Sequence, residues 1–347
     1  MNYYKSCKLC PRNCGVDRLS GETGFCGESA ELRLGVALLH CGEEPPLVGQ
    51  NGSGTIFVSG CNLGCALCQN YQISQRDNVF RNSSHKGAEA QRHRENKGEK
   101  RALGRVVSEN EFAGICLALR DKGAANINIV TGSHAIPAVV QGVIAAENAG
   151  VQIPLLWNTS AYENPEALEL LRDHVDIYLP DLKTLDSNLA ARFFNASDYP
   201  ETAAAAILKM IDMVHEASHR NVRGNACRNA HRNAHEKVIV RHLILPGYLE
   251  STRSVLRWFA ENAKDRAMLS LMTQYTPIPG RGTIPDTAPK RYLHETEYKT
   301  VMGYLEEFNI EYGFCQELVT GSDWLPDFKR PNPFSSELSV PVWHYAR

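Results

Sequence analysis

Three cysteines stand close together at Cys61, Cys65 and Cys68, in the pattern Cys-x3-Cys-x2-Cys. On one loop their sulfurs can converge within a few ångströms, and crowded thiolates are stable mainly when a metal neutralises them. A ferredoxin-type cluster would use Cys-x2-Cys-x2-Cys with a fourth cysteine soon after, whereas the next cysteine here is Cys116. Three thiolates on a four-iron cluster leave one iron open, and an open position usually marks a metal that does chemistry. A structural zinc with a distant fourth ligand is the alternative.

Four more cysteines form a second group near the N-terminus, Cys7-x2-Cys10-x3-Cys14-x11-Cys26. The first 30 residues are rich in turn residues and have no apolar periodicity, so we expect a lobe stapled by a metal rather than a packed one. The spacing fits structural zinc and a second iron–sulfur cluster equally well. A second cluster in this lobe would be able to relay electrons.

Composition excludes several classes of protein. The chain has 347 residues, 43% hydrophobic, with 37 basic and 39 acidic side chains, which suits one large domain with a small appendage. The near-neutral balance gives no case for nucleic acid or an anionic membrane as partner. No apolar run approaches the roughly 18 residues of a membrane span, and the N-terminus has no apolar signal core, so we expect a cytoplasmic protein.

Strand and helix patterns alternate along most of the chain. Buried strands that alternate with helices predict a parallel sheet with right-handed crossovers, here a partial (β/α)6 TIM-like barrel with chemistry at the carboxyl ends of the strands. A doubly wound open sheet is the alternative. We expect strands at 55–59, 126–131, 153–157, 175–179, 238–245, 268–275 and 310–315, and helices at 108–122, 137–148, 165–173, 200–216, 251–263 and 290–308.

The predicted domains are a cysteine-rich lobe at 1–40 and a barrel at 41–347. Two insertions interrupt the barrel. Residues 76–105 carry nine Lys/Arg against four acids and almost no large apolar residue, so we interpret them as a solvated insertion, with a docking patch for an acidic partner as the alternative. Residues 218–237 contain an Arg-Asn-Ala-His repeat, interpreted as low-complexity sequence; a metal comb of Cys227, His231 and His235 is the alternative.

The motifs of this chain together resemble a known family. They are similar to those of the radical S-adenosylmethionine (SAM) superfamily, in particular to the relatives of the pyruvate formate-lyase activating enzyme and, among these, the PflX-like group. The likeness runs almost from end to end, outside the two insertions. It rests on the two cysteine patterns, Glu43-Glu44-Pro45-Pro46, Ser59-Gly-Cys-Asn-Leu63, Asn158-Thr-Ser160, Asp176-Ile-Tyr-Leu-Pro-Asp-Leu-Lys183, Val240-Arg-His-Leu-Ile-Leu-Pro-Gly247 and Gly321-Ser-Asp-Trp324.

The resemblance implies a radical SAM oxidoreductase of the activating-enzyme type. In that superfamily three cysteines hold a 4Fe-4S cluster whose open iron binds SAM, so Cys61, Cys65 and Cys68 take this catalytic role. An electron from a flavodoxin- or ferredoxin-type reductant breaks the C5′–S bond of SAM, and the 5′-deoxyadenosyl radical takes a hydrogen from the substrate. The activating-enzyme relatives take it from a glycine of a partner protein. The alternatives are a small molecule or nucleic acid as substrate, a non-catalytic iron–sulfur electron carrier, or a zinc-stapled binding module.

The resemblance also implies a set of SAM contacts. The superfamily's second strand normally ends in Gly-Gly-Glu, whose carboxylate receives the SAM amino group, whereas this chain has Thr131-Gly132-Ser133-His134. Either backbone carbonyls around Thr131–Gly132 replace the carboxylate, or SAM binds in a slightly different position. Arg241, inside a predicted strand, needs an anionic partner, either the SAM carboxylate or an acid of the pocket. The expected cofactor-binding residues are Thr131, Gly132, His134, Asn158, Ser160, Asp181, Lys183, Arg241 and Gly247.

Overall fold

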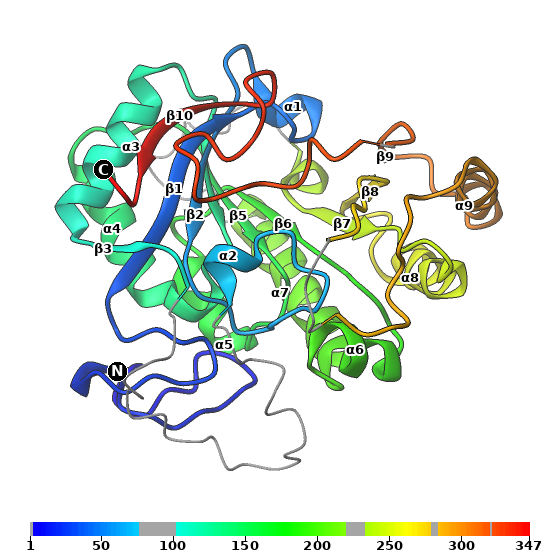
Figure 1. Cartoon of the computed structure of the whole chain (residues 1–347), viewed down its shortest axis with the longest axis horizontal. Helices are drawn as coiled ribbons and strands as arrows, with labels where there is room; N and C mark the ends of the chain where they lie inside the picture. Colours follow the sequence, from blue (N-terminus) through cyan, green and yellow to red (C-terminus); the bar gives the residue numbers. More distant parts are fainter. Residues whose placement is uncertain (1–2, 76–101, 220–232, 279–283, 320) are drawn as a thin grey trace.

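The fold is a partial parallel barrel with helices outside it (Figure 1). The computed structural model describes residues 3–75, 102–219, 233–278, 284–319 and 321–347. Strands β2 (Ser53–Val58), β4 (Ile127–Val130), β5 (Leu155–Thr159) and β6 (Ile177–Pro180) pair in parallel in one sheet. Strands β7 (Ile239–Leu243), β8 (Met268–Met272) and β9 (Gly313–Cys315) pair in parallel in a second sheet.

The two sheets continue into one another. Parallel bridges join Tyr178 to Val238 and Asp181 to Arg241, at the edge between β6 and β7. Each parallel strand therefore lies beside the one before it in the chain, in the order β2, β4, β5, β6, β7, β8 and β9. A doubly wound sheet would reverse this order at its switch point. The predicted partial barrel is confirmed, and the open doubly wound sheet is wrong.

Buried apolar strands and amphipathic helices produce this arrangement. All residues of β2, β4 and β6 are buried. The crossover helices α3 (Glu109–Asp121), α4 (Ile136–Asn148), α5 (Pro165–Leu168), α7 (Tyr199–His219), α8 (Leu249–Asn262) and α9 (Glu295–Glu307) lie at the predicted positions. The Ser108 hydroxyl caps α3 by accepting a hydrogen bond from the Glu111 N–H. Helix α6 (Ser187–Phe194), begun by an Asp186 cap, was not predicted from the sequence.

An antiparallel flank borders β2. Strand β1 (Leu32–His40) pairs with β2 and with β10 (Ser339–His344), and the short β3 (Arg105–Val107) pairs with the start of β1. The C-terminal segment thereby returns across the sheet, and Phe328 and Phe334 pack against Phe57 (Figure 1). Because β1 belongs to this sheet, we propose that the cysteine-rich lobe ends near residue 31 and not at residue 40.

Within the described ranges, every helix is too short or too polar to span a membrane. Most of residues 76–105 and 218–237, including Cys227 and His231, lie outside the described residues. His235 is described, and its ring Nε2 lies 3.1 Å from the Lys264 carbonyl oxygen.

Candidate functional site

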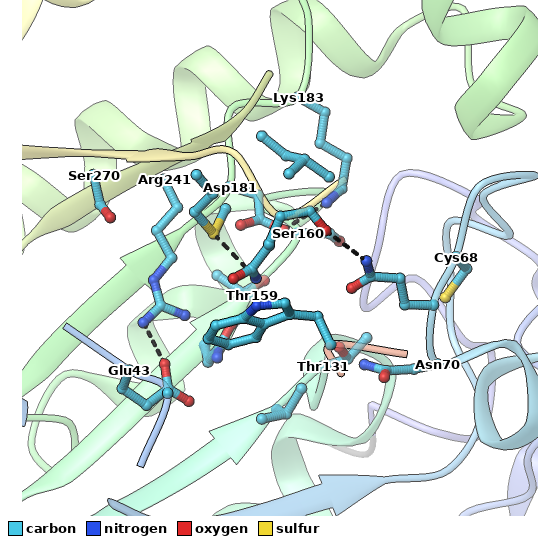
Figure 2. A pocket seen from close by; sticks show the side chains of 18 of the residues that line it. Glu43, Cys68, Asn70, Thr131, Thr159, Ser160, Asp181, Lys183, Arg241 and Ser270 are labelled. Carbon is cyan, nitrogen blue, oxygen red and sulfur yellow. Dashed lines mark hydrogen bonds and ion pairs between the residues drawn. The ribbon is translucent and has the colours of Figure 1, made fainter. Parts of the chain in front are cut away.

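A cavity of about 680 Å³ lies at the carboxyl ends of the parallel strands. Its size is that of a site for a cofactor together with a substrate, since ligand pockets span roughly 300–1,000 Å³. Most of the predicted site residues line it, and these are Cys61, Cys65, Cys68, Thr131, Asn158, Ser160, Asp181, Lys183 and Arg241. The sequence therefore predicted a set of residues that the fold does bring together (Figure 2).

The three-cysteine loop leaves β2 and runs along one side of this cavity. It turns at Gly60, which has φ +82° and where a Cβ would lie 2.5 Å from the Glu28 side chain, so only glycine fits. Backbone and side-chain bonds fix the loop: the Ala66 N–H donates to the Phe193 carbonyl at 2.7 Å, and the Gln75 amide donates to the Cys65 carbonyl at 2.6 Å. The loop is thus held by the barrel rather than by its own sulfurs alone.

The loop's thiols fit a metal cluster. Burial raises the pKa of the Cys65 thiol well above its ordinary value, the Lys183 ammonium opposes this, and Cys68 and Cys61 add to it. Buried thiols this near one another lose their protons together only when a cation neutralises them. Three soft sulfur donors beside an open cavity suit an iron–sulfur cluster with one exposed iron.

The middle of the cavity carries polar groups at the ends of β4, β5 and β6. Thr131 has φ +59°, a left-handed conformation that is costly for a β-branched residue and that tends to occur at functional sites. The Ser160 hydroxyl is buried and has no hydrogen-bond partner among the described residues, so it is available to a ligand. These groups fit the ribose or the amino-acid portion of SAM, which offers donors and acceptors.

Asp181 and Lys183 form an ion pair in this same region, with 2.5 Å between Nζ and Oδ2 (Figure 2). Burial opposes the charge of Lys183, but Asp181 together with Tyr199 and Cys65 outweighs it, and the pKa of Lys183 is raised. The Tyr199 hydroxyl donates to the Asp181 carbonyl at 2.7 Å and fixes the turn that carries both side chains. The pair is therefore fixed in orientation.

We expect Ser160→Ala to weaken SAM binding by about three- to tenfold, the loss of one ordinary hydrogen bond. The unfolding midpoint should not change, because the hydroxyl makes no hydrogen bond within the described protein. Equilibrium binding of SAM to the reconstituted enzyme, with thermal unfolding of the same samples, checks both statements. An unchanged SAM affinity would mean that the Ser160 hydroxyl does not hydrogen-bond to SAM.

Arg241 pairs with acidic side chains of the pocket, one of the two kinds of anionic partner expected from the sequence. Its guanidinium donates to Glu44 through Nε at 2.9 Å and through Nη2, and Nη2 also donates to Glu43 at 2.6 Å. All three side chains are at most 10% exposed. Burial opposes the charge of Arg241, but Glu44 and Glu43 outweigh it, so its pKa is raised; likewise Arg241 holds the pKa of Glu44 low despite burial.

Three predicted contacts lie elsewhere. Gly132 is absent from the cavity wall, and a Cβ there would lie 2.5 Å from the Trp157 ring, so packing explains this glycine. His134 sits in a short 3-10 turn (Ser133–Ala135) and lines the small cavity of the cysteine-rich lobe, and its Nε2 lies 2.9 Å from the carbonyl oxygen of Ser59, the residue after β2. Gly247 borders a separate depression, and its N–H donates to Glu297 at 2.7 Å.

Several residues of the cavity wall were not predicted as site residues. His40, Glu43, Glu44 and Trp324 line it, although three of them stand in motifs already noted, Glu43-Glu44-Pro45-Pro46 and Gly321-Ser-Asp-Trp324. Cys315, which an apolar sequence context predicts to be buried, is exposed and also lines the cavity. The motifs were the available signal, but nothing local shows that these segments converge.

The cysteine-rich lobe packs directly against the three-cysteine loop. Cys7, Cys10, Cys14 and Cys26 line one small cavity together with Arg18 and His134. Burial raises the pKa of the Cys10 thiol to about 12. In the part of the chain that the structure describes, no three His, Cys, Asp or Glu side chains form a ready-made site for a single metal ion. The lobe's metal and its ligands remain a prediction.

Arg12 connects the two cysteine groups. It lies between Cys10 and Cys14 in the sequence, and its guanidinium donates to the carbonyl oxygens of Asn62 at 2.8 Å and Leu63 at 2.9 Å. Both carbonyls belong to the loop that begins at Cys61. Any ordering of the lobe is therefore transmitted to that loop.

Fold and site together define a partial α/β barrel with a cavity at the carboxyl ends of its strands, lined on one side by a three-cysteine loop. The sequence profile of the Radical SAM superfamily matches residues 55–259, and the chain belongs to this superfamily. The family brings with it a 4Fe-4S cluster and SAM, and the cavity described above fits both.

The individual proteins that this chain resembles share little sequence identity with it. The chain is 28% identical over 312 residues to the uncharacterized protein MJ0674 of Methanocaldococcus jannaschii, covering 89% of this chain and 77% of that protein. Among solved structures it resembles SuiB of Streptococcus suis bound to the precursor peptide SuiA, with TM-score 0.45, 16% identity and 74% of this chain covered. SuiB bound to SAM gives TM-score 0.46 and 14% identity over 76% of this chain. The chain spans slightly less than half of either SuiB chain.

Proposed function

We propose that this protein cleaves SAM reductively at a cluster held by Cys61, Cys65 and Cys68 and takes a hydrogen atom from a substrate bound in the same cavity. The main observation in support of this proposal is that these cysteines and the polar strand ends at Ser160 and Asp181 line a single cavity. One electron from a flavodoxin- or ferredoxin-type reductant and one SAM give methionine and a 5′-deoxyadenosyl radical. Hydrogen transfer then gives 5′-deoxyadenosine and a substrate radical, so atoms and electrons balance.

The protein's own part is to orient and to exclude water. The cluster, when bound, would supply the electron and an open iron to which the amino and carboxylate groups of SAM bind. The loop around Cys65 holds the cluster against the cavity, and Ser160, Asn158 and the strained Thr131 backbone face the bound SAM. The fixed Asp181–Lys183 pair presents both charges to the amino-acid portion of SAM and replaces part of the missing Gly-Gly-Glu contact.

Within the superfamily we place the chain with the PflX-like, activating-enzyme-related group. The motifs that occur along the chain from Cys7 to Trp324 support this placement. The activating-enzyme analogy makes a glycine of a partner protein one candidate hydrogen donor, and a small molecule the other.

Anaerobic reconstitution with iron and sulfide, followed by dithionite and SAM, tests the proposal. We expect 5′-deoxyadenosine, detected by mass spectrometry, in amounts that depend on both reductant and SAM. A reduced cluster that never cleaves SAM would overturn the enzymatic proposal and leave an electron carrier.

We propose that the N-terminal lobe holds a second metal, zinc or an iron–sulfur cluster, on Cys7, Cys10, Cys14 and Cys26. Cys14→Ser should lower the iron or zinc content per chain by this site's share, while the absorption of the Cys61-Cys65-Cys68 cluster persists. Cys41→Ser is the matched control, because Cys41 is exposed and lines neither cavity. Metal analysis and absorption spectra check both variants. Unchanged metal content in Cys14→Ser would contradict the second site.

A further inference from the structure

The charges on the wall of the main cavity do not cancel. Its acidic and basic side chains, among the described residues, are three Asp/Glu (Glu43, Glu44, Asp181) and two Lys/Arg (Lys183, Arg241). The sum of their formal charges is one excess negative charge. His40 does not correct it: burial lowers the pKa of His40, and its Nδ1 accepts the Gly42 N–H at 3.2 Å, so the ring is neutral.

The excess charge lies at one end. Figure 2 shows Glu43 and Arg241 on one side of the pocket and Cys68 with Asn70 on the other, with Ser160 and Asp181 between them. Asp181 is paired with Lys183, so the middle of the cavity is neutral. At the far end Glu43 and Glu44 both pair with Arg241, and the His40 ring lies 3.8 Å from Glu43. The negative charge is therefore remote from the cluster loop.

The two glutamates differ in how fully they are bonded. Glu44 receives Arg241 through both of its oxygens and also a hydrogen bond from Ser270. Glu43 receives one bond from Arg241 at 2.6 Å and one from the Asn128 amide at 2.9 Å. Since a carboxylate offers about four acceptor positions, Glu43 retains room for further donors.

Asn128 holds Glu43 in place from below the cavity wall. Its side chain is fully buried, is bonded to Glu43 through Nδ2 and is absent from the cavity lining. It therefore fixes one oxygen of Glu43, and the remaining acceptor positions of this cavity-lining carboxylate are open to a group with N–H donors.

Aromatic rings complete this end of the cavity. Trp324 packs so closely on the Glu43 loop that a Cβ at Gly42 would lie 2.6 Å from its ring, and Phe334 meets the His40 ring edge-on at 5.0 Å. Aromatic faces beside a carboxylate attract organic cations. The proposed function assigns SAM and the cluster to the cysteine loop on the opposite side of the cavity, so this end faces the substrate.

We propose that the end of the cavity formed by Glu43, Trp324 and Phe334 binds a cationic group of the substrate, an ammonium or guanidinium. The group donates N–H bonds to Glu43 and lies against the Trp324 ring. This inference rests on the proposed function, since it assigns the cluster side of the same cavity to SAM. It narrows the substrate to an amine or guanidine, free or carried on a peptide.

A pair of isosteric probes tests it. Calorimetric titrations of the anaerobically reconstituted enzyme with SAM present would compare n-butylguanidinium with neutral n-butylurea. We expect the cation to bind at least tenfold more tightly than the urea. In Glu43→Gln the two affinities should become equal, whereas Glu169→Gln, which removes an exposed carboxylate on the barrel's outside, should retain the preference.

Two results would overturn the proposal: equal affinities in the wild-type enzyme, including no saturable binding of either probe, or an unchanged preference in Glu43→Gln. The same preparations are assayed for 5′-deoxyadenosine formation. Loss of SAM cleavage with the cation preference intact would refute the proposed function and leave the cationic site. SAM cleavage without the preference would do the reverse.

Discussion

Replacing Cys65 by alanine is expected to abolish SAM cleavage while the barrel still folds. Altering groups that merely support metal ligands already costs about 10- to 100-fold, so loss of a ligand should cost at least about a hundredfold. The fold should persist because the buried parallel strands, and not the loop, form the core. Production of 5′-deoxyadenosine, iron content and circular dichroism together measure the two effects.

Cys116→Ala is the matched control. Cys116 is 2% exposed inside α3, and burial alone raises the pKa of its thiol to about 12, so it behaves as a small apolar side chain. Its removal should leave iron content and SAM cleavage near the wild-type values. SAM cleavage retained by Cys65→Ala would refute the assignment of the cluster. Loss of SAM cleavage in both Cys65→Ala and Cys116→Ala would indicate general misfolding instead.

The cluster loop and the parallel strands could be predicted because their signals are local. Cys61, Cys65 and Cys68 lie within a few residues of one another, and each buried strand is a short apolar run followed by a turn. The alternation of these strands with helices predicted the parallel barrel. Structural features that depend on residues close together in the chain can therefore be predicted from the sequence.

The far end of the cavity could not be predicted in this way. Glu44 and Arg241 meet across 197 positions of sequence, and only the closed arrangement of β1 beside β2 and of β6 beside β7 brings them together. The arginine's need for an acid was evident, but its partner was not. His134 shows the converse error: a strand end normally faces the site, but the 3-10 turn after Gly132 directs this ring toward the lobe.

Replacing Arg241 by methionine is expected to destabilise the protein by about 3–5 kcal/mol at pH 7, because it leaves Glu43 and Glu44 buried without a cation. Chemical unfolding of the reconstituted protein measures this loss. Arg253→Met is the control: its partner Glu307 is exposed, and a solvated pair contributes little. Adding Glu43→Gln and Glu44→Gln to Arg241→Met should recover much of the stability, because the buried charge disappears.

The pH dependence gives the second test of this pair. In the wild type, Arg241 holds the pKa of Glu44 below its usual value even against burial, so the pair stabilises the fold above the unfolded carboxyl pKa of about 4.3 and this contribution is lost as the pH falls through the folded value. In Arg241→Met, burial acts alone and raises the carboxyl pKa. As the pH falls, protonation removes the buried charge and reduces the destabilisation of the variant.

The difference in unfolding free energy between wild type and Arg241→Met should therefore be largest near pH 7 and shrink toward pH 5. A difference that is independent of pH would mean that Arg241 acts through packing of its side chain and not through the charge of Glu43 and Glu44. In that case the excess negative charge assigned to the far end of the cavity would also lose its basis, since Glu43 and Glu44 would not both be ionised beside Arg241 in the wild type.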